Sequence, residues 1–296
     1  MTDMKARKMK IIGILHLLAA LYLTEACGLK QVAETVSYPQ WPELPAIVSG
    51  AEGQFISHEL GSRRNYSMLY DAGTMSASWV AYPLCEADMS SGRVESWAYD
   101  PKIPQDSQTD VRQGYGVEVS TEGYSRNFYA RGHQIPNADR NAVEGMMAQT
   151  YYSTNMTPQI QNGFNGGIWS KLEAAVREMV PPGDTLYVVT GACYRTRGGN
   201  EEIISITNRN DGRSLPVPNY YYKALLKLSK AGDRACCIGF WLPHKAYKKV
   251  KYSDFTLPVD SLELLTGVDF FHNLPDSIEG IAESNASLDA FISFEL

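Results

Sequence analysis

The sequence predicts an α+β domain with a central, mainly antiparallel sheet. Short segments rich in β-branched and aromatic residues stand before and after one well-marked amphipathic helix, as expected when strands and helices form separate layers. The chain has 296 residues, of which 44% are hydrophobic and 20% charged, a composition typical of globular domains. It shows no internal repeat and no low-complexity tract, so we expect one large domain behind the N-terminal segment.

Six segments are predicted as strands. The clearest is Ser-Trp-Val-Ala-Tyr at 78–82, and Lys-Ala-Gly-Asp at 230–233 has the turn chemistry of a hairpin between the last two strands. Residues 86–127 are polar and rich in Pro and Gly, which predicts a long surface excursion of the kind that often carries function. The predicted strands cover residues 54–58, 66–70, 78–82, 185–190, 220–228 and 235–242.

One helix is predicted over residues 168–178. Its apolar residues Ile168, Leu172 and Val176 recur every four positions, and two prolines at 181–182 end it. A second helix is expected near 261–265.

A polar stripe follows the first helix. Asn165, Trp169, Glu173 and Arg177 are each four residues apart, and four residues turn an α-helix by only about 40° beyond a full turn. Three of these four side chains are polar, which is unusual for a helix face that adjoins a core. We therefore expect this stripe to line a cleft.

Residues 1–26 are predicted to be an export signal. A basic segment at 5–10 precedes a mostly apolar run at 11–23 that is too short for a membrane span. Cys27 follows a small residue at the end of this run, as in a bacterial lipoprotein signal, although Glu25 departs from the strict pattern. We expect an exported lipoprotein anchored to a membrane through a lipid on Cys27, or otherwise a periplasmic or secreted protein. A retained membrane anchor is the remaining alternative.

Residues 27–52 are predicted to be a flexible tether, because they include Tyr-Pro-Gln-Trp-Pro-Glu-Leu-Pro and show neither a helical nor a strand period. The folded domain is then expected over residues 53–296.

The four cysteines of this domain lack the paired spacing of a zinc site. The adjacent pair Cys236 and Cys237 should point to opposite faces of a strand, so at most one of them should meet Cys193. A disulfide and buried free thiols are both compatible with this pattern. The fourth cysteine is Cys85.

Three motifs occur in a fixed order along the chain. They are Arg131-Gly132-His133, then Asn155-x-x-Pro-Gln, then Asn165, Trp169, Glu173 and Arg177 at intervals of four residues. The ordered set resembles the DNA/RNA non-specific endonucleases of the ββα-metal class, over roughly residues 55–275. The resemblance implies the ββα-metal nuclease fold. The first motif of that family usually begins with Asp, and here Ala130 takes its place, which puts the fine positioning of the site in doubt.

The chemistry of these residues agrees with phosphodiester hydrolysis. His133 can accept a proton from water near neutral pH. The amide oxygen of Asn165 is a hard ligand suited to Mg²⁺, for which Mn²⁺ may substitute, and waters and phosphate oxygens can complete the shell. Such an ion would stabilise charge on the phosphate and on the leaving oxygen. Glu173 lies two helical turns further on, where its side chain is placed to hold a water of the ion's shell.

Other roles come from the resemblance. It implies that Arg131 and Arg177 clamp phosphate oxygens and that Arg93 makes a further phosphate contact. It also implies that Asn155 is a substrate-binding residue, which orients groups beside the metal. Because such contacts reach the DNA and RNA backbone and carry no base information, cleavage should be independent of sequence and of sugar. The resemblance also implies products with 5′-phosphate ends.

The net charge of the chain is unfavourable for binding nucleic acid. The formal net charge is −6, and it is near −8 once residues 1–26, with four basic and two acidic residues, are removed. Phosphate binding favours Lys and Arg, so this charge argues against a broad, tight, DNA-coating surface but does not exclude a local basic cleft. Together with Ala130, this charge supports an alternative function, a catalytically impaired nucleic-acid-binding surface lipoprotein on the same fold. A purely structural lipoprotein would leave the polar stripe unexplained.

Overall fold

A computed structural model describes residues 38–47 and 53–296 of the chain. The predicted signal at 1–26, Cys27 and part of the predicted tether lie outside the described residues. Within the described ranges, no helix combines the length and the apolar character needed to cross a membrane.

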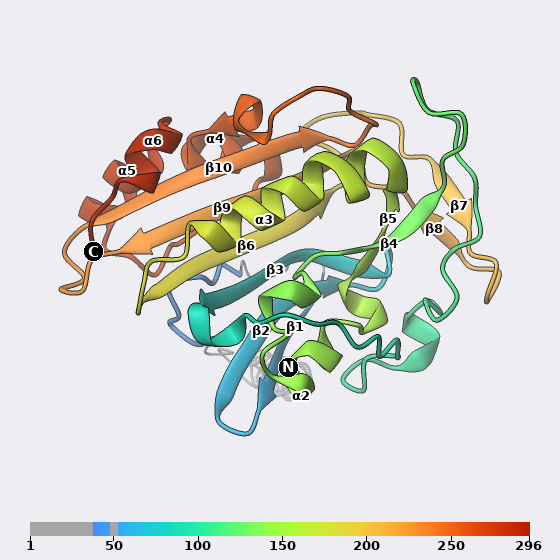
Figure 1. Cartoon of the computed structure of the whole chain (residues 1–296), viewed down its shortest axis with the longest axis horizontal. Helices are drawn as coiled ribbons and strands as arrows, with labels where there is room; N and C mark the ends of the chain where they lie inside the picture. The colour runs from blue at the N-terminus through green and yellow to red at the C-terminus, as the bar shows by residue number, and fades with distance from the viewer. Residues whose placement is uncertain (1–37, 48–52) are drawn as a thin grey trace, which may run out of the picture. The chain divides into compact units, whose positions relative to one another are not determined.

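A seven-stranded sheet forms the centre of the domain, in the order β1-β2-β3-β6-β9-β10-β11 (Figure 1). Every neighbouring pair is antiparallel, which confirms the predicted fold class. The strands are β1 (Gln54–Leu60), β2 (Arg63–Asp71), β3 (Ser76–Cys85), β6 (Thr185–Cys193), β9 (Tyr220–Leu228), β10 (Ala235–Pro243) and β11 (Thr256–Leu257).

The central strands are buried on both faces. In β3, Val80 and Tyr82 join one hydrophobic core, whereas Trp79 and Ala81 join the other, as the two-residue period of a strand requires. The same alternation places Cys236 and Cys237 in different cores, which confirms that they point to opposite faces. All four cysteines of the domain are free thiols.

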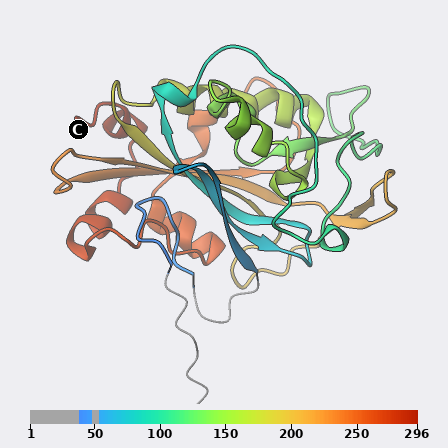
Figure 2. The same ribbon diagram turned by 90° about the horizontal axis from the view of Figure 1, so that it is seen from below.

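Two layers of other elements cover the sheet (Figure 2). One face carries α3 (Ser170–Glu178) and, beside it, the two-stranded ribbon of β4 (Tyr129–His133) and β5 (Met156–Ile160). The opposite face carries α4 (Val259–Thr266) and α5 (Asp276–Glu283). The remaining elements are α2 (Glu144–Gln149), α6 (Leu288–Ile292) and a hairpin of β7 (Ser205–Thr207) with β8 (Ser214–Pro216).

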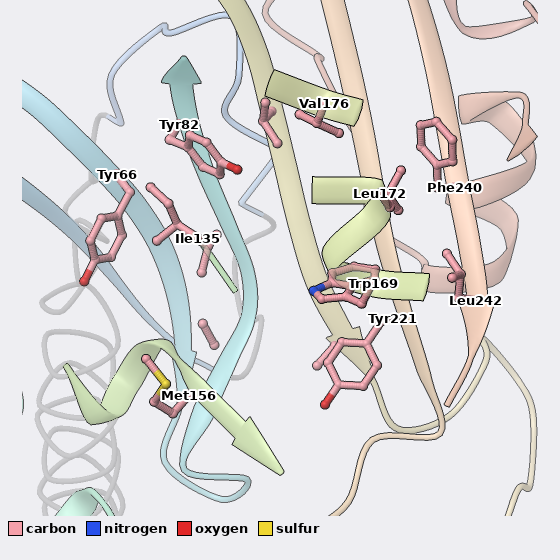
Figure 3. Close-up of a cluster of buried hydrophobic side chains, with 14 of the residues drawn as sticks. Tyr66, Tyr82, Ile135, Met156, Trp169, Leu172, Val176, Tyr221, Phe240 and Leu242 are labelled. Atoms are coloured by element: carbon pink, nitrogen blue, oxygen red, sulfur yellow. The ribbon is translucent and has the colours of Figure 1, made fainter. Parts of the chain in front are cut away.

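The helix α3 packs on the sheet through the apolar residues that predicted it. Leu172 and Val176 are almost fully buried, and Figure 3 shows them facing the strands that carry Tyr221 and Phe240. Trp169, which precedes the helix, is 1% exposed and belongs to the same core. Burying a side chain of this size contributes roughly 1.5–3 kcal/mol, so this face holds the helix in place.

Part of the predicted tether belongs to the folded domain, which is a correction to the sequence-based boundary. Residues from Gln40 onward form one compact unit. Leu44 is 1% exposed, Glu43 forms an ion pair with Arg64, and the amide N–H of Ala46 donates to the carbonyl of Asp269 at 2.8 Å. These contacts are made across the fold and therefore leave no periodic signal in the sequence.

The segment between β3 and β4 is the long excursion that was predicted, with 3₁₀ turns and isolated bridges. Asp100 fixes its middle, because its carboxylate bonds to His58 Nε2 at 2.9 Å and accepts from Thr154 Oγ1 at 2.7 Å. His58 therefore has a structural role.

Candidate active site

The Arg-Gly-His motif lies on the ribbon outside the main sheet. The antiparallel pairing of β4 with β5 places Arg131 opposite Pro158 and His133 opposite Met156. A Cβ atom on Gly132 would lie 2.2 Å from the side chain of the buried Gln159, so any larger residue would displace the layer beneath the motif. The ribbon runs directly into an irregular turn and then into α3, which together form a ββα element.

A cavity of about 610 Å³ opens over this element. It brings together five of the seven predicted site residues, which come from the long excursion, from β4, from the irregular turn and from α3. These five are Arg93, Arg131, His133, Asn165 and Glu173. The two others, Asn155 and Arg177, do not line it.

The imidazole of His133 packs in a cluster of aromatic rings. Its ring centre lies 5.5 Å from that of Trp97 and 5.1 Å from that of Tyr151. Burial, with the nearby guanidinium groups of Arg93 and Arg131, lowers the pKa of His133 to about 3. Its Nε2 is buried and has no hydrogen-bond partner among the described residues. The ring is therefore neutral at pH 7 and keeps one nitrogen unused by the protein.

Arg131 is held at the cavity edge. Its Nη1 donates to two backbone carbonyls of the excursion, those of Val111 and Arg112, both at 2.9 Å. Its guanidinium carbon lies 3.7 Å from the ring centre of Trp97, a cation–π contact. Arg93 is more exposed and pairs with Glu95 at 3.1 Å. These two cations give the cavity a local positive charge that the acidic total of the chain does not reveal.

Asn165 stands in the irregular turn Gln161–Trp169, not in a regular helix. Gly163 has a φ of 85°, and Gly166 and Gly167 also leave helical geometry. The predicted stripe from Asn165 to Arg177 is therefore not one continuous helix face, because Gly166 and Gly167 interrupt the helix after Asn165. Asn165 and Glu173 nevertheless line the same cavity.

The amide of Asn165 is oriented by a neighbour. Its Nδ2 donates to Oε1 of Gln161 at 2.9 Å, and its Oδ1 has no protein partner in the part of the chain that the structure describes. A neutral amide oxygen at the edge of a wide cavity fits Mg²⁺, which prefers oxygen ligands and keeps several waters. The donor set of this chain is thus compatible with such an ion.

Glu173 lines the cavity from the first turn of α3. Burial raises its pKa to about 7, and the nearby ammonium of Lys223 opposes this shift. Lys223 is fully buried on β9, donates to Thr190 Oγ1 at 3.1 Å and lies 4.7 Å from the ring centre of Trp169. Glu173 therefore has a buried basic neighbour behind the cavity lining, which local sequence patterns do not single out.

Asn155 is placed differently from the prediction. It is fully buried, and both atoms of its amide are used: Oδ1 accepts from the N–H of Ile135, and Nδ2 donates to the carbonyls of Ile135 and Thr150. It therefore cannot contact substrate in this structure. Instead it fixes the segment that directly follows His133.

Arg177 also lies behind the cavity and not in it. Its Nη1 donates to Asp139 Oδ1 at 2.9 Å, and Asp139 accepts a second bond from the hydroxyl of Tyr82 at 2.8 Å. Because the guanidinium of Arg177 is already paired with a buried carboxylate, Arg177 is poorly placed to contact a substrate phosphate directly.

Among the cavity residues that were not predicted, Trp97 and Arg209 have the clearest contacts with the site. Trp97 covers His133 and stacks on Arg131. Arg209 reaches the cavity from the connection between β7 and β8, and its Nη2 donates to the carbonyl of Gln113 at 3.2 Å. Nothing local in the sequence distinguishes Arg209 from other exposed arginines.

The ββα element, with a histidine beneath a basic cavity, defines a nucleic-acid hydrolase of the ββα-metal class. The chain belongs to the DNA/RNA non-specific endonuclease family, whose model matches residues 49–277. Metal dependence is typical of that family.

Relatives and a solved structure agree with this membership. The chain is similar to the mitochondrial nuclease of Saccharomyces cerevisiae, with 25% identity over 74% of this chain and 68% of that protein. It is similar to nuclease C1 of Cunninghamella echinulata, with 28% identity over 74% and 84%. Its fold is similar to the structure described as the EndoG/EndoGI complex, with a TM-score of 0.60, 21% identity, and coverage of 77% of this chain and 91% of that one.

Proposed function

We propose that this nuclease is an endonuclease that hydrolyses phosphodiester bonds of DNA and RNA without preference for sequence or sugar, with His133 as general base. The observation that carries the proposal is the cavity that joins a neutral imidazole, three guanidinium groups and a free amide oxygen. These groups recognise a phosphate and a water, and none of them reads a base.

The residues divide the reaction between them. His133 takes a proton from the water that attacks phosphorus, because its ring is neutral and one nitrogen has no protein partner. Arg131 and Arg93 stabilise the charge that builds on the phosphate oxygens. Breakage of the P–O3′ bond then leaves a 5′-phosphate, and the departing O3′ takes a proton from solvent. Glu173, when ionised, accepts hydrogen bonds from water in the cavity.

Asn165 would hold a Mg²⁺ ion, which Mn²⁺ could replace. When bound, the ion supplies Lewis-acid stabilisation to the phosphate and to the leaving oxygen. One neutral protein ligand should give modest affinity, so the enzyme should need added metal.

A plasmid-nicking assay tests the function. Wild-type protein should nick supercoiled DNA and degrade RNA with Mg²⁺ but not with excess EDTA. His133→Ala should lose about 10²–10⁴-fold in turnover, the usual contribution of a general base, and still bind DNA. His272→Ala, which alters a histidine outside the cavity lining, is the matched control and should retain activity. A His133→Ala rate within about threefold of wild type would remove His133 from this role.

The second candidate is a catalytically impaired nucleic-acid-binding protein, and Ala130 favours it. Ala130 lines the cavity and pairs with Gln159 in the ribbon. In the same assay, DNA binding without nicking at any metal concentration would support this candidate. Recovery of nicking in Ala130→Asp would then identify the missing carboxylate as the cause.

We also propose that the protein is exported and anchored by a lipid on Cys27, on the basis of the signal pattern at residues 1–26. The wild-type protein should then partition with membranes, and Cys27→Ser should not. Equal solubility of the two proteins would leave only ordinary secretion.

A further inference from the structure

Three carboxylates meet on the face of the sheet opposite the active site. Asp260 and Glu263 lie on α4, and Glu283 ends α5. One oxygen of each lies within 4.8 Å of the others. The apolar residues of both helices join the core that lies under α4 and α5, whereas His133 and α3 belong to the other layer (Figures 1 and 2). This cluster is therefore separate from the proposed catalytic cavity.

Glu283 is the unusual member of the cluster. Its side chain is buried, with the residue 4% exposed, and its Oε1 has no hydrogen-bond partner among the described residues. A buried carboxylate without a partner is strongly unfavourable, and native proteins normally pair such a group or bind a metal with it. An external ligand such as a metal ion would satisfy this carboxyl group.

The carboxylates around Glu283 add negative charge. Burial, and then the carboxylates of Glu263, Glu279, Asp260 and Asp269, raise the pKa of Glu283 to about 9. Glu263 is fixed from one side, because its Oε1 accepts from the N–H of Phe270 at 2.7 Å, which leaves its other oxygen available.

Two members of the cluster face an open cavity. This cavity of about 350 Å³ is lined by Asp260, Glu263 and Asp269, and Arg197 is the basic residue among the described residues that line it. Within the described part of the chain, Arg197 forms no ion pair with these carboxylates. A small hydrated cation can therefore reach Asp260 and Glu263 from outside.

We propose that Asp260, Glu263 and Glu283 form a second metal site, which binds Ca²⁺ and joins α4 to α5. All three donors are carboxylate oxygens, which select a hard cation over the ions that prefer nitrogen or sulfur. Ca²⁺–oxygen distances of about 2.3–2.6 Å allow ligand atoms on opposite sides of the ion to be about 5 Å apart. The spread of up to 4.8 Å fits within this limit, whereas Mg²⁺ demands a tighter, near-ideal octahedron. Waters and the nearby Asp269 can fill the remaining positions.

The alternative is a cluster of carboxyl groups that share protons and bind no ion. The two cases differ in one respect, because a metal site gains stability from added Ca²⁺ and a proton-sharing cluster does not.

Thermal unfolding of the EDTA-treated full-length protein tests the proposal. If the dissociation constant is near 10⁻⁴ M, about 5 mM CaCl₂ should raise the melting temperature by about 4–8 °C. Glu283→Gln should need at least about 10-fold more Ca²⁺ for half of this shift, and Glu122→Gln, an exposed acidic control, should behave as wild type. Asn165→Ala should also keep the shift, because the two sites are separate.

Calorimetric titration with Ca²⁺ supplies a second measurement in case Glu283→Gln fails to fold. Wild-type protein treated with EDTA should bind one Ca²⁺ at this site, and Asp260→Asn, a change at an exposed position, should weaken that binding by about 10-fold or more. Absence of a Ca²⁺-dependent shift in the wild type, or an equal shift in the variants of Asp260 and Glu283, would overturn the proposal. Nicking activity with Mg²⁺ is scored independently, so failure here leaves the proposed endonuclease untouched.

Discussion

The imidazole of His133 should stay neutral far below pH 6.5, and opening its aromatic enclosure should raise its pKa. Burial, and then the charges of Arg93 and Arg131, bring its pKa to about 3. Trp97→Ala removes a ring whose centre lies 5.5 Å from the imidazole and admits water. Since burial is the larger cause, we expect the pKa of His133 to rise by about one unit or more.

The size of the effect follows from the titration curve. At pH 5 an imidazole with a pKa of about 3 is about 99% neutral, whereas one with the ordinary pKa near 6.5 is only about 3% neutral. Full exposure would thus reduce the amount of general base about 30-fold at that pH. The same shift affects stability. Because the folded pKa lies below the unfolded one, the contribution of His133 to stability is present above pH 6.5 and is lost as the pH falls toward 3.

Nuclear magnetic resonance of ¹³C-labelled histidine measures the pKa directly and does not depend on turnover. Trp241→Ala is the matched control, since Trp241 stacks on Tyr220 and does not line the cavity. The reasoning fails if His133 titrates near pH 6.5 in the wild type, or if Trp97→Ala leaves its pKa unchanged.

Three further predictions concern the site and the fold. Asn165→Ala should lose turnover and regain part of it at high Mg²⁺. Its loss of turnover should be strongly non-additive with that of His133→Ala, because both residues serve one step. Additive losses in the double variant would mean that the two residues act in different steps. Arg209→Ala should raise KM with little change in kcat and reduce the salt dependence of DNA binding, measured by fluorescence anisotropy; an unchanged salt slope would exclude a phosphate contact. Arg140 is fully buried and donates to Asn65 and to the carbonyl of Pro83, so Arg140→Met should lower the free energy of unfolding by about 3–5 kcal/mol in urea titrations. The exposed pair of Arg126 provides the control for Arg140→Met, since Arg126→Met should cost less than about 1 kcal/mol.

Local patterns in the sequence were sufficient for much of the sheet and for α3. The strand at 220–228 has the predicted bounds, because alternating and continuous apolar runs record directly which faces are buried. The short strands β7, β8 and β11 and the helices α2, α5 and α6 were not predicted. Most of these elements have two to six residues, too few to establish a period, and long-range contacts hold them in place.

The sequence alone determined the family and the residues of the Arg-Gly-His motif, because those depend on the order of motifs along the chain. Tertiary structure decided what each residue can reach. It buried Asn155, paired Arg177 with Asp139, and brought Trp97 onto His133 from a distant segment. It also set the pKa of His133, since desolvation and nearby charge depend on neighbours in space and not on neighbours in sequence. For the same reason, only the packing of α4 against α5 could bring Glu283 beside two carboxylates that lie some twenty residues earlier in the chain.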